Sequence, residues 1–97
     1  MRLKVKEAEF IKQIAKDCFG KEAKIYLFGS RVSDAKKGGD IDLYIETTGK
    51  EHLFDKKLKM LQALYAKLGE QKIDIVINNF TSSLYIYEIA RQEGILL

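Results

Sequence analysis

The sequence has 97 residues, of which 46% are hydrophobic and 32% charged, a composition that excludes an intrinsically disordered chain. We expect a single domain over residues 1–97, large enough for one modest core. No apolar run is long enough to span a bilayer. A net charge of +3, with lysines spread along the chain, argues against a nucleic-acid-binding protein.

The first residues and the cysteine content indicate the cellular compartment of the protein. Residues 1–6 are charged and contain no apolar stretch followed by a cleavage site, so they are not a signal peptide. Cys18 is the single cysteine, which excludes an internal disulfide. We therefore expect a cytoplasmic protein.

Apolar spacing predicts three elements in the first half of the chain. A helix is expected over residues 6–19, ending at Gly20, and a strand over residues 24–28. That strand leads into Gly29-Ser30, where a short helix or turn begins. After a polar stretch, the strict alternation of residues 40–46 predicts a second strand.

The second half predicts a helix, a strand and a final helix. Thr48 and Glu51 fit a capping box that opens a helix ending near residue 68, before Gly69. Residues 73–77 form a third strand, and Ser82 or Ser83 caps a helix over residues 84–92 that stops at a glycine. The face of the middle helix expected to be buried holds Phe54, Leu58, Leu61, Tyr65 and Leu68. This order predicts an α/β (α+β) fold, a small mixed sheet with helices packed on it.

Asp40 and Asp42 are the first candidate site residues. Successive side chains of a strand point to opposite faces, so both aspartates share one face, at Cα atoms about 7 Å apart. Their carboxylates repel each other and favour a cation between them. The core-facing residues of this strand would be Ile41, Leu43 and Ile45, and the other residues beside the carboxylates would be Tyr44 and Glu46.

Asp74 is the third candidate, an aspartate among the apolar residues of the third predicted strand. An aspartate is unfavourable there and costly to bury without a partner. If this strand neighbours the second one, Asp74 joins the other two carboxylates. Three carboxylates suit Mg²⁺, which keeps some waters and takes its remaining ligands from substrate phosphates.

Gly29-Ser30 supplies a candidate anion site, because a glycine at a strand end followed by serine allows close backbone approach and offers N–H groups and a hydroxyl. Arg31 adds positive charge, and Lys36 and Lys37 lie nearby in sequence. Each feature also has a plain structural interpretation. The aspartates could be the solvent face of an edge strand, and the basic residues could be surface residues. Cys18 is expected in the core and His52 on the surface, and Tyr44 and Glu46 receive no functional role.

The spacing of Gly29-Ser30, Asp40-Ile41-Asp42 and Asp74 resembles the signature of the DNA polymerase β-type nucleotidyltransferases, and most closely the minimal nucleotidyltransferases (MNT). The resemblance extends over nearly the whole chain, because residues 87–97 are similar to the C-terminal helix of those proteins. One loop is a residue shorter than in many minimal members. The resemblance implies a polymerase β-like fold in which Gly29 and Ser30 hold the triphosphate, Asp40 and Asp42 bridge two divalent metals, and Asp74 completes one metal site and helps to activate the attacking hydroxyl.

The implied reaction is attack of a hydroxyl on the α-phosphate of a nucleoside triphosphate, with ATP as the expected donor and two Mg²⁺ ions, replaceable by Mn²⁺. Larger relatives carry a further domain for the acceptor. The MNT resemblance implies instead a helical HEPN-type partner, a ribonuclease toxin, with the short protein as an antitoxin that adenylylates a toxin tyrosine.

Two alternatives remain open. One is the nucleotide-binding subunit of a two-component enzyme acting on a small molecule or RNA. The other is a non-catalytic antitoxin that inhibits its partner by binding. A homo- or hetero-oligomer is compatible with each. The expected docking surface is apolar and lies at the C-terminal end: Leu84, Tyr85, Tyr87, Ile95, Leu96 and Leu97.

Overall fold

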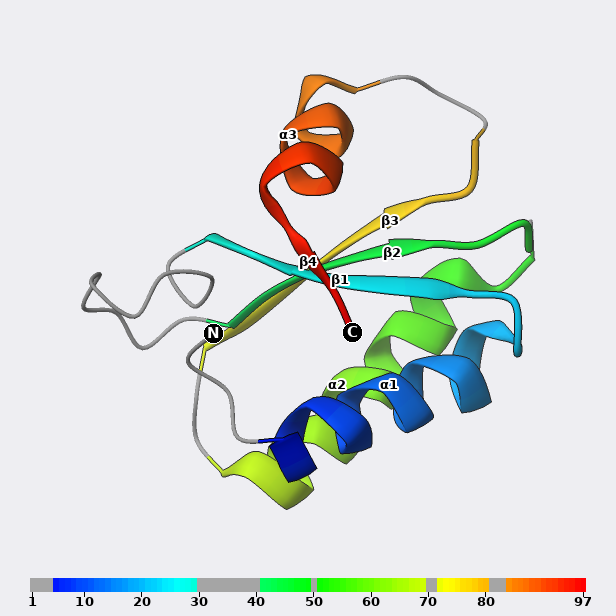
Figure 1. Ribbon diagram of the computed structural model, residues 1–97. Helices are drawn as coiled ribbons and strands as arrows, with labels where there is room; N and C mark the ends of the chain where they lie inside the picture. Colours follow the sequence, from blue (N-terminus) through cyan, green and yellow to red (C-terminus); the bar gives the residue numbers. More distant parts are fainter. Residues whose placement is uncertain (1–4, 30–40, 50, 70–71, 81–83) are drawn as a thin grey trace.

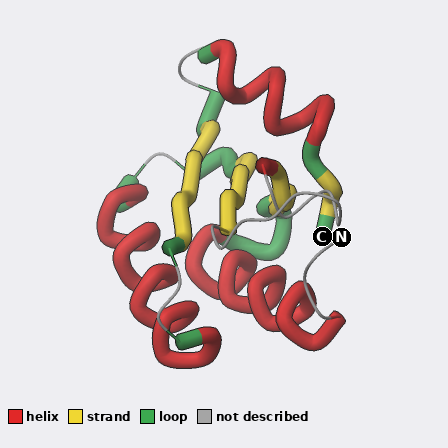
Figure 2. The backbone as a smooth tube through the Cα atoms, turned by 90° about the vertical axis from the view of Figure 1, so that its left-hand side faces the viewer, coloured by secondary structure: helices red, strands yellow, loops and turns green. Residues whose placement is uncertain are grey.

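The computed structural model describes residues 5–29, 41–49, 51–69, 72–80 and 84–97. A four-stranded sheet lies between two helices on one face and one helix on the other (Figures 1 and 2). The elements in chain order are α1 (Val5–Phe19), β1 (Lys24–Phe28), β2 (Ile41–Glu46), α2 (Leu53–Leu68), β3 (Ile73–Asn78), α3 (Tyr85–Glu93) and β4 (Ile95–Leu96). This arrangement confirms the predicted α+β class.

The sheet is mixed, with strand order β3-β2-β1-β4. Strand β1 is antiparallel to both β2 and β4, whereas β2 and β3 are parallel and are joined through α2. Strand β4 corrects one expectation, because residues 87–97 were compared as a whole with a C-terminal helix and the last part of them forms a strand. Gly94 ends α3 as predicted, and the next two residues, Ile95 and Leu96, then pair with Leu27 and Tyr26.

The core lies between the sheet and the helices α1 and α2. Ile41, Leu43 and Ile45 are at most 1% exposed and point into this layer, as the alternation of the strand predicted. Cys18 packs against the same core, also as expected. The remaining buried residues of this layer come from both helices, from the other strands and from the turn before β1: Ile11, Ala15, Phe19, Ala23, Ile25, Leu27, Met60, Leu64, Ile73 and Ile75.

The buried face of α2 differs from the predicted one. Met60 and Leu64 are fully buried, whereas Phe54 is 70% exposed and Leu58 and Tyr65 are each 43% exposed. The two remaining residues of the predicted face pack against the core while partly buried: Leu61 and Leu68. Two neighbouring rows of apolar side chains on α2 both have helical spacing, and the row that contains Met60 is the one buried in the core. In the other row, Phe54, Leu58 and Tyr65 lie at the surface.

The start of α2 also corrects a prediction. His52, not Thr48, occupies the N-cap position, with φ 57° and no side-chain capping bond. The side chain of His52 is exposed, as expected. Gly69 ends the helix, as predicted.

Helix α3 begins without the serine cap that the sequence predicted. Leu84 is at its N-cap position, and Ser82 and Ser83 lie outside the described residues. Among the helices that the structure describes, none has the length and apolar character to cross a membrane.

Candidate active site

The register of the sheet brings two of the three candidate aspartates together. Strands β2 and β3 pair in parallel with Asp42 directly opposite Asp74. Paired residues on neighbouring strands have Cα atoms about 5 Å apart, and both side chains emerge on the face opposite α1 and α2. Asp42 is partly exposed and Asp74 is exposed. Two carboxylates therefore lie side by side near one end of the sheet.

Gly29 is fitted against the carboxylate of Asp42. It follows β1 directly and has φ +77°, a conformation that favours glycine. A Cβ atom added to Gly29 would lie 2.2 Å from Oδ2 of Asp42 and 3.0 Å from its Cγ. The backbone thus passes so close to this carboxylate that no side chain fits between them. The neighbour of Gly29 is thus a carboxylate of the protein, and the expected approach of its backbone to a phosphate stays a prediction.

Several predicted site residues lie outside the described residues: Ser30, Arg31, Lys36, Lys37 and Asp40. Within the described part of the chain, no group of three His, Cys, Asp or Glu side chains is placed to hold a metal ion. The set of three carboxylates that the sequence suggested includes Asp40, so it stays a prediction. The described pair, Asp42 and Asp74, offers only oxygen donors, the type that Mg²⁺ prefers.

Tyr44 and Glu46 continue the same face of β2 but are buried under α3. The Tyr44 hydroxyl donates to Oε2 of Glu46 at 2.8 Å and accepts from Nδ2 of Asn78 at 3.0 Å. Arg91 of α3 forms a salt bridge with the same Oε2 of Glu46, its Nε donating at 2.8 Å. Sequence reasoning gave these residues no role. Alternation places Tyr44 and Glu46 on this face, but no pattern links them to Arg91, which is 45 residues away from Glu46.

The surroundings of Tyr44 and Arg91 determine their protonation states. Burial raises the pKa of the Tyr44 phenol, and the hydrogen bond to Glu46 raises it further. The hydrogen bond to Glu46 also raises the pKa of Arg91. Tyr44 is therefore a neutral hydrogen-bonding group at physiological pH, and Arg91 is a permanent cation.

Helix α3 packs on this face over Tyr44 and Glu46, whereas Asp42 is partly exposed and Asp74 is exposed. The Tyr87 hydroxyl donates to the backbone carbonyl of Ile77 near the end of β3, at 3.0 Å, and the Tyr87 ring lies 5.8 Å from the ring of Tyr44. Together with the Arg91–Glu46 pair, these contacts hold α3 against the sheet (Figure 1). Asp42 and Asp74 lie near the starts of those strands. The two carboxylates and the adjacent backbone turn at Gly29 thus form an oxygen-rich, anionic site.

The chain matches the family model described as "Polymerase beta, Nucleotidyltransferase" over residues 9–97. No curated protein matches it. The matched region contains Gly29 and Asp42 and Asp74, and it covers nearly all of the 97 residues, as in a minimal nucleotidyltransferase. The chain therefore belongs to the polymerase β nucleotidyltransferase family.

Proposed function

We propose that the chain transfers a nucleoside monophosphate, AMP from ATP, to a tyrosine hydroxyl of a helical HEPN-type partner, and so acts as an antitoxin. Family membership supports the nucleotidyl-transfer chemistry. The observation that supports this choice of site is the pairing of Asp42 with Asp74 on one face of the sheet. Like charges held so close together favour a bound cation.

The donor set fits divalent metal. Asp42 and Asp74, with Asp40, would hold two Mg²⁺ ions, or Mn²⁺ in their place. When bound, such ions lower the pKa of an attacking hydroxyl and neutralise charge that develops on the phosphate oxygens. The orientation of Asp42 is constrained, because the Gly29 backbone lies against its carboxylate.

The roles of the other residues follow from their positions. Asp74 is exposed on the edge strand β3, so an acceptor hydroxyl can approach it from solvent and give up its proton there. Gly29 precedes Ser30 and Arg31, and this segment would hold the triphosphate through backbone N–H groups, a hydroxyl and a positive charge. Catalysis would then rest on positioning and electrostatics.

The acceptor is proposed to come from a second protein. The family model spans residues 9–97, and the acceptor is the part of the reaction for which we assign no residues in that span. Exposed apolar side chains at the start of α3 support a docking surface: Leu84 is 49% exposed and Tyr85 77%. Leu96 of β4 is also exposed, at 56%. The other residues expected in this surface are only partly exposed: Tyr87, Ile95 and Leu97.

Intact-mass spectrometry tests the proposal. The chain is incubated with ATP, Mg²⁺ and the product of the neighbouring gene, and the mass of each protein is measured. An increase of one or more AMP units on the partner is expected, and it should disappear with Asp42→Asn. A tight complex that shows no mass change at saturating ATP would instead identify an antitoxin that acts by contact alone.

A further inference from the structure

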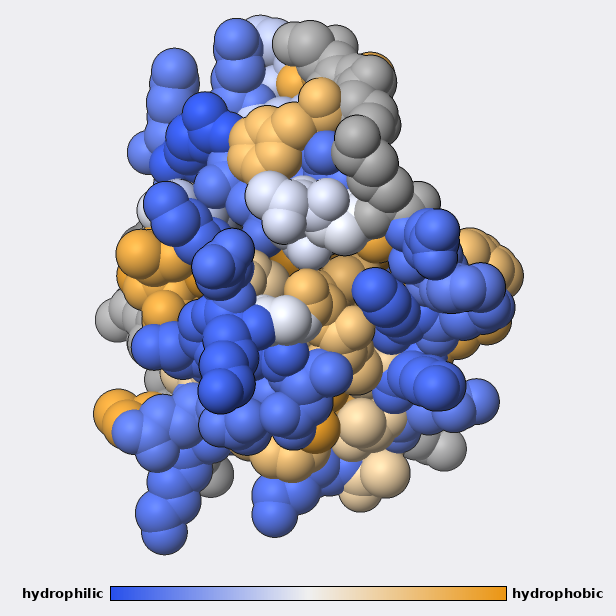
Figure 3. Space-filling model, turned by 90° about the vertical axis from the view of Figure 1, so that its right-hand side faces the viewer, coloured by the Kyte–Doolittle hydropathy of each residue, from blue (hydrophilic) through white to orange (hydrophobic). Residues whose placement is uncertain are grey.

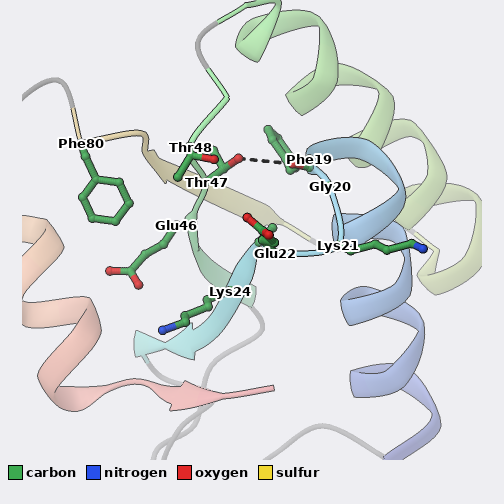
Figure 4. A pocket seen from close by; sticks show the side chains of 10 residues that line it. Phe19, Gly20, Lys21, Glu22, Lys24, Glu46, Thr47, Thr48 and Phe80 are labelled. Carbon is green, nitrogen blue, oxygen red and sulfur yellow. Dashed lines mark hydrogen bonds between the residues drawn. The ribbon is translucent and has the colours of Figure 1, made fainter.

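A cavity of about 570 Å³ lies at the opposite end of the sheet from the two aspartates. It is formed by the start of β1, the end of β2 and the segment that follows β3, and Phe80 and Glu46 are among its lining residues (Figure 4). Glu46 follows Asp42 by four residues on β2, about 13 Å along the strand. The cavity is therefore separate from the candidate active site, and its volume is in the range of small-molecule sites.

Phe80 is strained and exposed at this cavity. Its φ is +65°, which is rare and costly for a bulky side chain, and the residue is 58% exposed. The conformation is held by Asn78, whose Oδ1 accepts from the backbone N–H of Phe80 at 2.9 Å. Core packing does not account for an aromatic ring held in this way. The ring does provide a flat surface on which a planar ligand can stack.

Glu46 brings an unsatisfied acceptor to the same cavity. Its side chain is only 9% exposed, and its hydrogen bonds with Tyr44 and Arg91 all go to one oxygen, Oε2. The other oxygen, Oε1, has no hydrogen-bond partner among the described residues. A buried carboxylate oxygen without a partner is costly and calls for a donor.

A lysine beside Glu46 indicates which charge the ligand of this cavity carries. Lys24 is exposed and lies directly opposite Glu46 in the β1–β2 register. In Figure 4 the Phe80 ring, the Glu46 carboxylate and the Lys24 side chain lie toward the α3 side of the cavity. The lysine disfavours a cationic guest such as an arginine side chain, and it favours an anionic substituent on the ligand. In the space-filling view of this end of the molecule, hydrophobic surface lies between hydrophilic side chains (Figure 3).

We propose that this cavity is a second, metal-independent binding site for an adenine nucleotide. The purine ring stacks on Phe80, its exocyclic amino group donates to Oε1 of Glu46, and its phosphate lies toward Lys24. The proposal goes beyond nucleotidyl transfer at Asp42 and Asp74 and does not depend on it, because it uses neither carboxylate.

The probe is AMP, titrated calorimetrically into the protein in the presence of EDTA, so that metal-dependent binding at the aspartates is absent. AMP is expected to bind, and Phe80→Gly should weaken binding at least tenfold while the protein becomes more resistant to unfolding. Phe54→Ala is the matched control, because Phe54 is also an exposed aromatic side chain but lies on α2. Its affinity for AMP should equal that of the wild type.

A second experiment changes the ligand and uses the wild-type protein. Purine riboside monophosphate keeps the ring and the phosphate but lacks the amino group, and it should bind the wild type at least tenfold more weakly than AMP. The proposal is overturned if AMP does not bind in EDTA, if Phe80→Gly binds as well as the wild type, or if both ligands bind equally. It is also overturned if Asp42→Asn, and not Phe80→Gly, abolishes binding.

Discussion

Replacing Gly29 with alanine perturbs the candidate active site through the backbone. The new Cβ would lie 2.2 Å from Oδ2 of Asp42, and ordinary contact begins at 3.4 Å, so the carboxylate or the turn must move by about 1.2 Å. A positive φ adds strain of about 1–3 kcal/mol in the folded state. A misplacement of about 1 Å in a catalytic site costs roughly 100-fold in rate.

Gly69→Ala separates the two effects. Gly69 has φ +82°, close to the value of Gly29, but an added Cβ meets nothing within 4 Å. Both variants should therefore lose about 1–3 kcal/mol of unfolding free energy in urea denaturation. Only Gly29→Ala should also lose about 100-fold in nucleotidyl transfer, measured at temperatures where both variants are folded. Equal transfer rates in the two variants would show that the contact between Gly29 and Asp42 does not position the carboxylate.

Four further predictions concern Asp74, Tyr44, the pH dependence of stability and Met60. Asp74→Asn should abolish transfer without lowering the melting temperature, because it removes a like charge beside Asp42; near-native turnover would contradict this role. Tyr44→Phe should cost about 1–3 kcal/mol in urea denaturation, since the buried Asn78 amide loses its acceptor. Because burial raises the pKa of Tyr44 above its ordinary value of 10.0, wild-type stability should fall as the pH rises above about 10, and this group's contribution should vanish in Tyr44→Phe. Met60→Ala should cost about 2–5 kcal/mol, and comparable losses from truncating the exposed Tyr65 would show that the wrong face of α2 was assigned to the core.

Local patterns were sufficient to predict the main strands and one part of the site. The alternation along β2 separates Ile41 and Leu43 from Asp42, and this separation is what the structure shows. The position of Asp74 within an apolar strand also marked it as a candidate site residue. These signals are visible in the sequence because a strand has a period of two and because an unpaired aspartate is unfavourable in it.

Features that depend on distant contacts could not be predicted. The salt bridge between Arg91 and Glu46 joins residues 45 positions apart, and no local pattern marks Arg91. Two apolar rows on α2 have helical spacing, so periodicity alone does not say which one is buried; packing in the folded protein decides it. Strand β4 has only two residues, Ile95 and Leu96, too few to produce a period, and it forms because β1 offers a free edge.

In the proposed nucleotidyl-transfer site, Asp42 and Asp74 hold the metals. A crystal structure of the protein with Mn²⁺ and a non-hydrolysable ATP analogue tests this most directly, because anomalous scattering locates manganese without reference to the partner. We predict manganese peaks within about 2.0–2.4 Å of carboxylate oxygens of both aspartates, with the triphosphate beside Gly29. Nucleotide bound with manganese elsewhere in the molecule, and none at Asp42 or Asp74, would contradict the account.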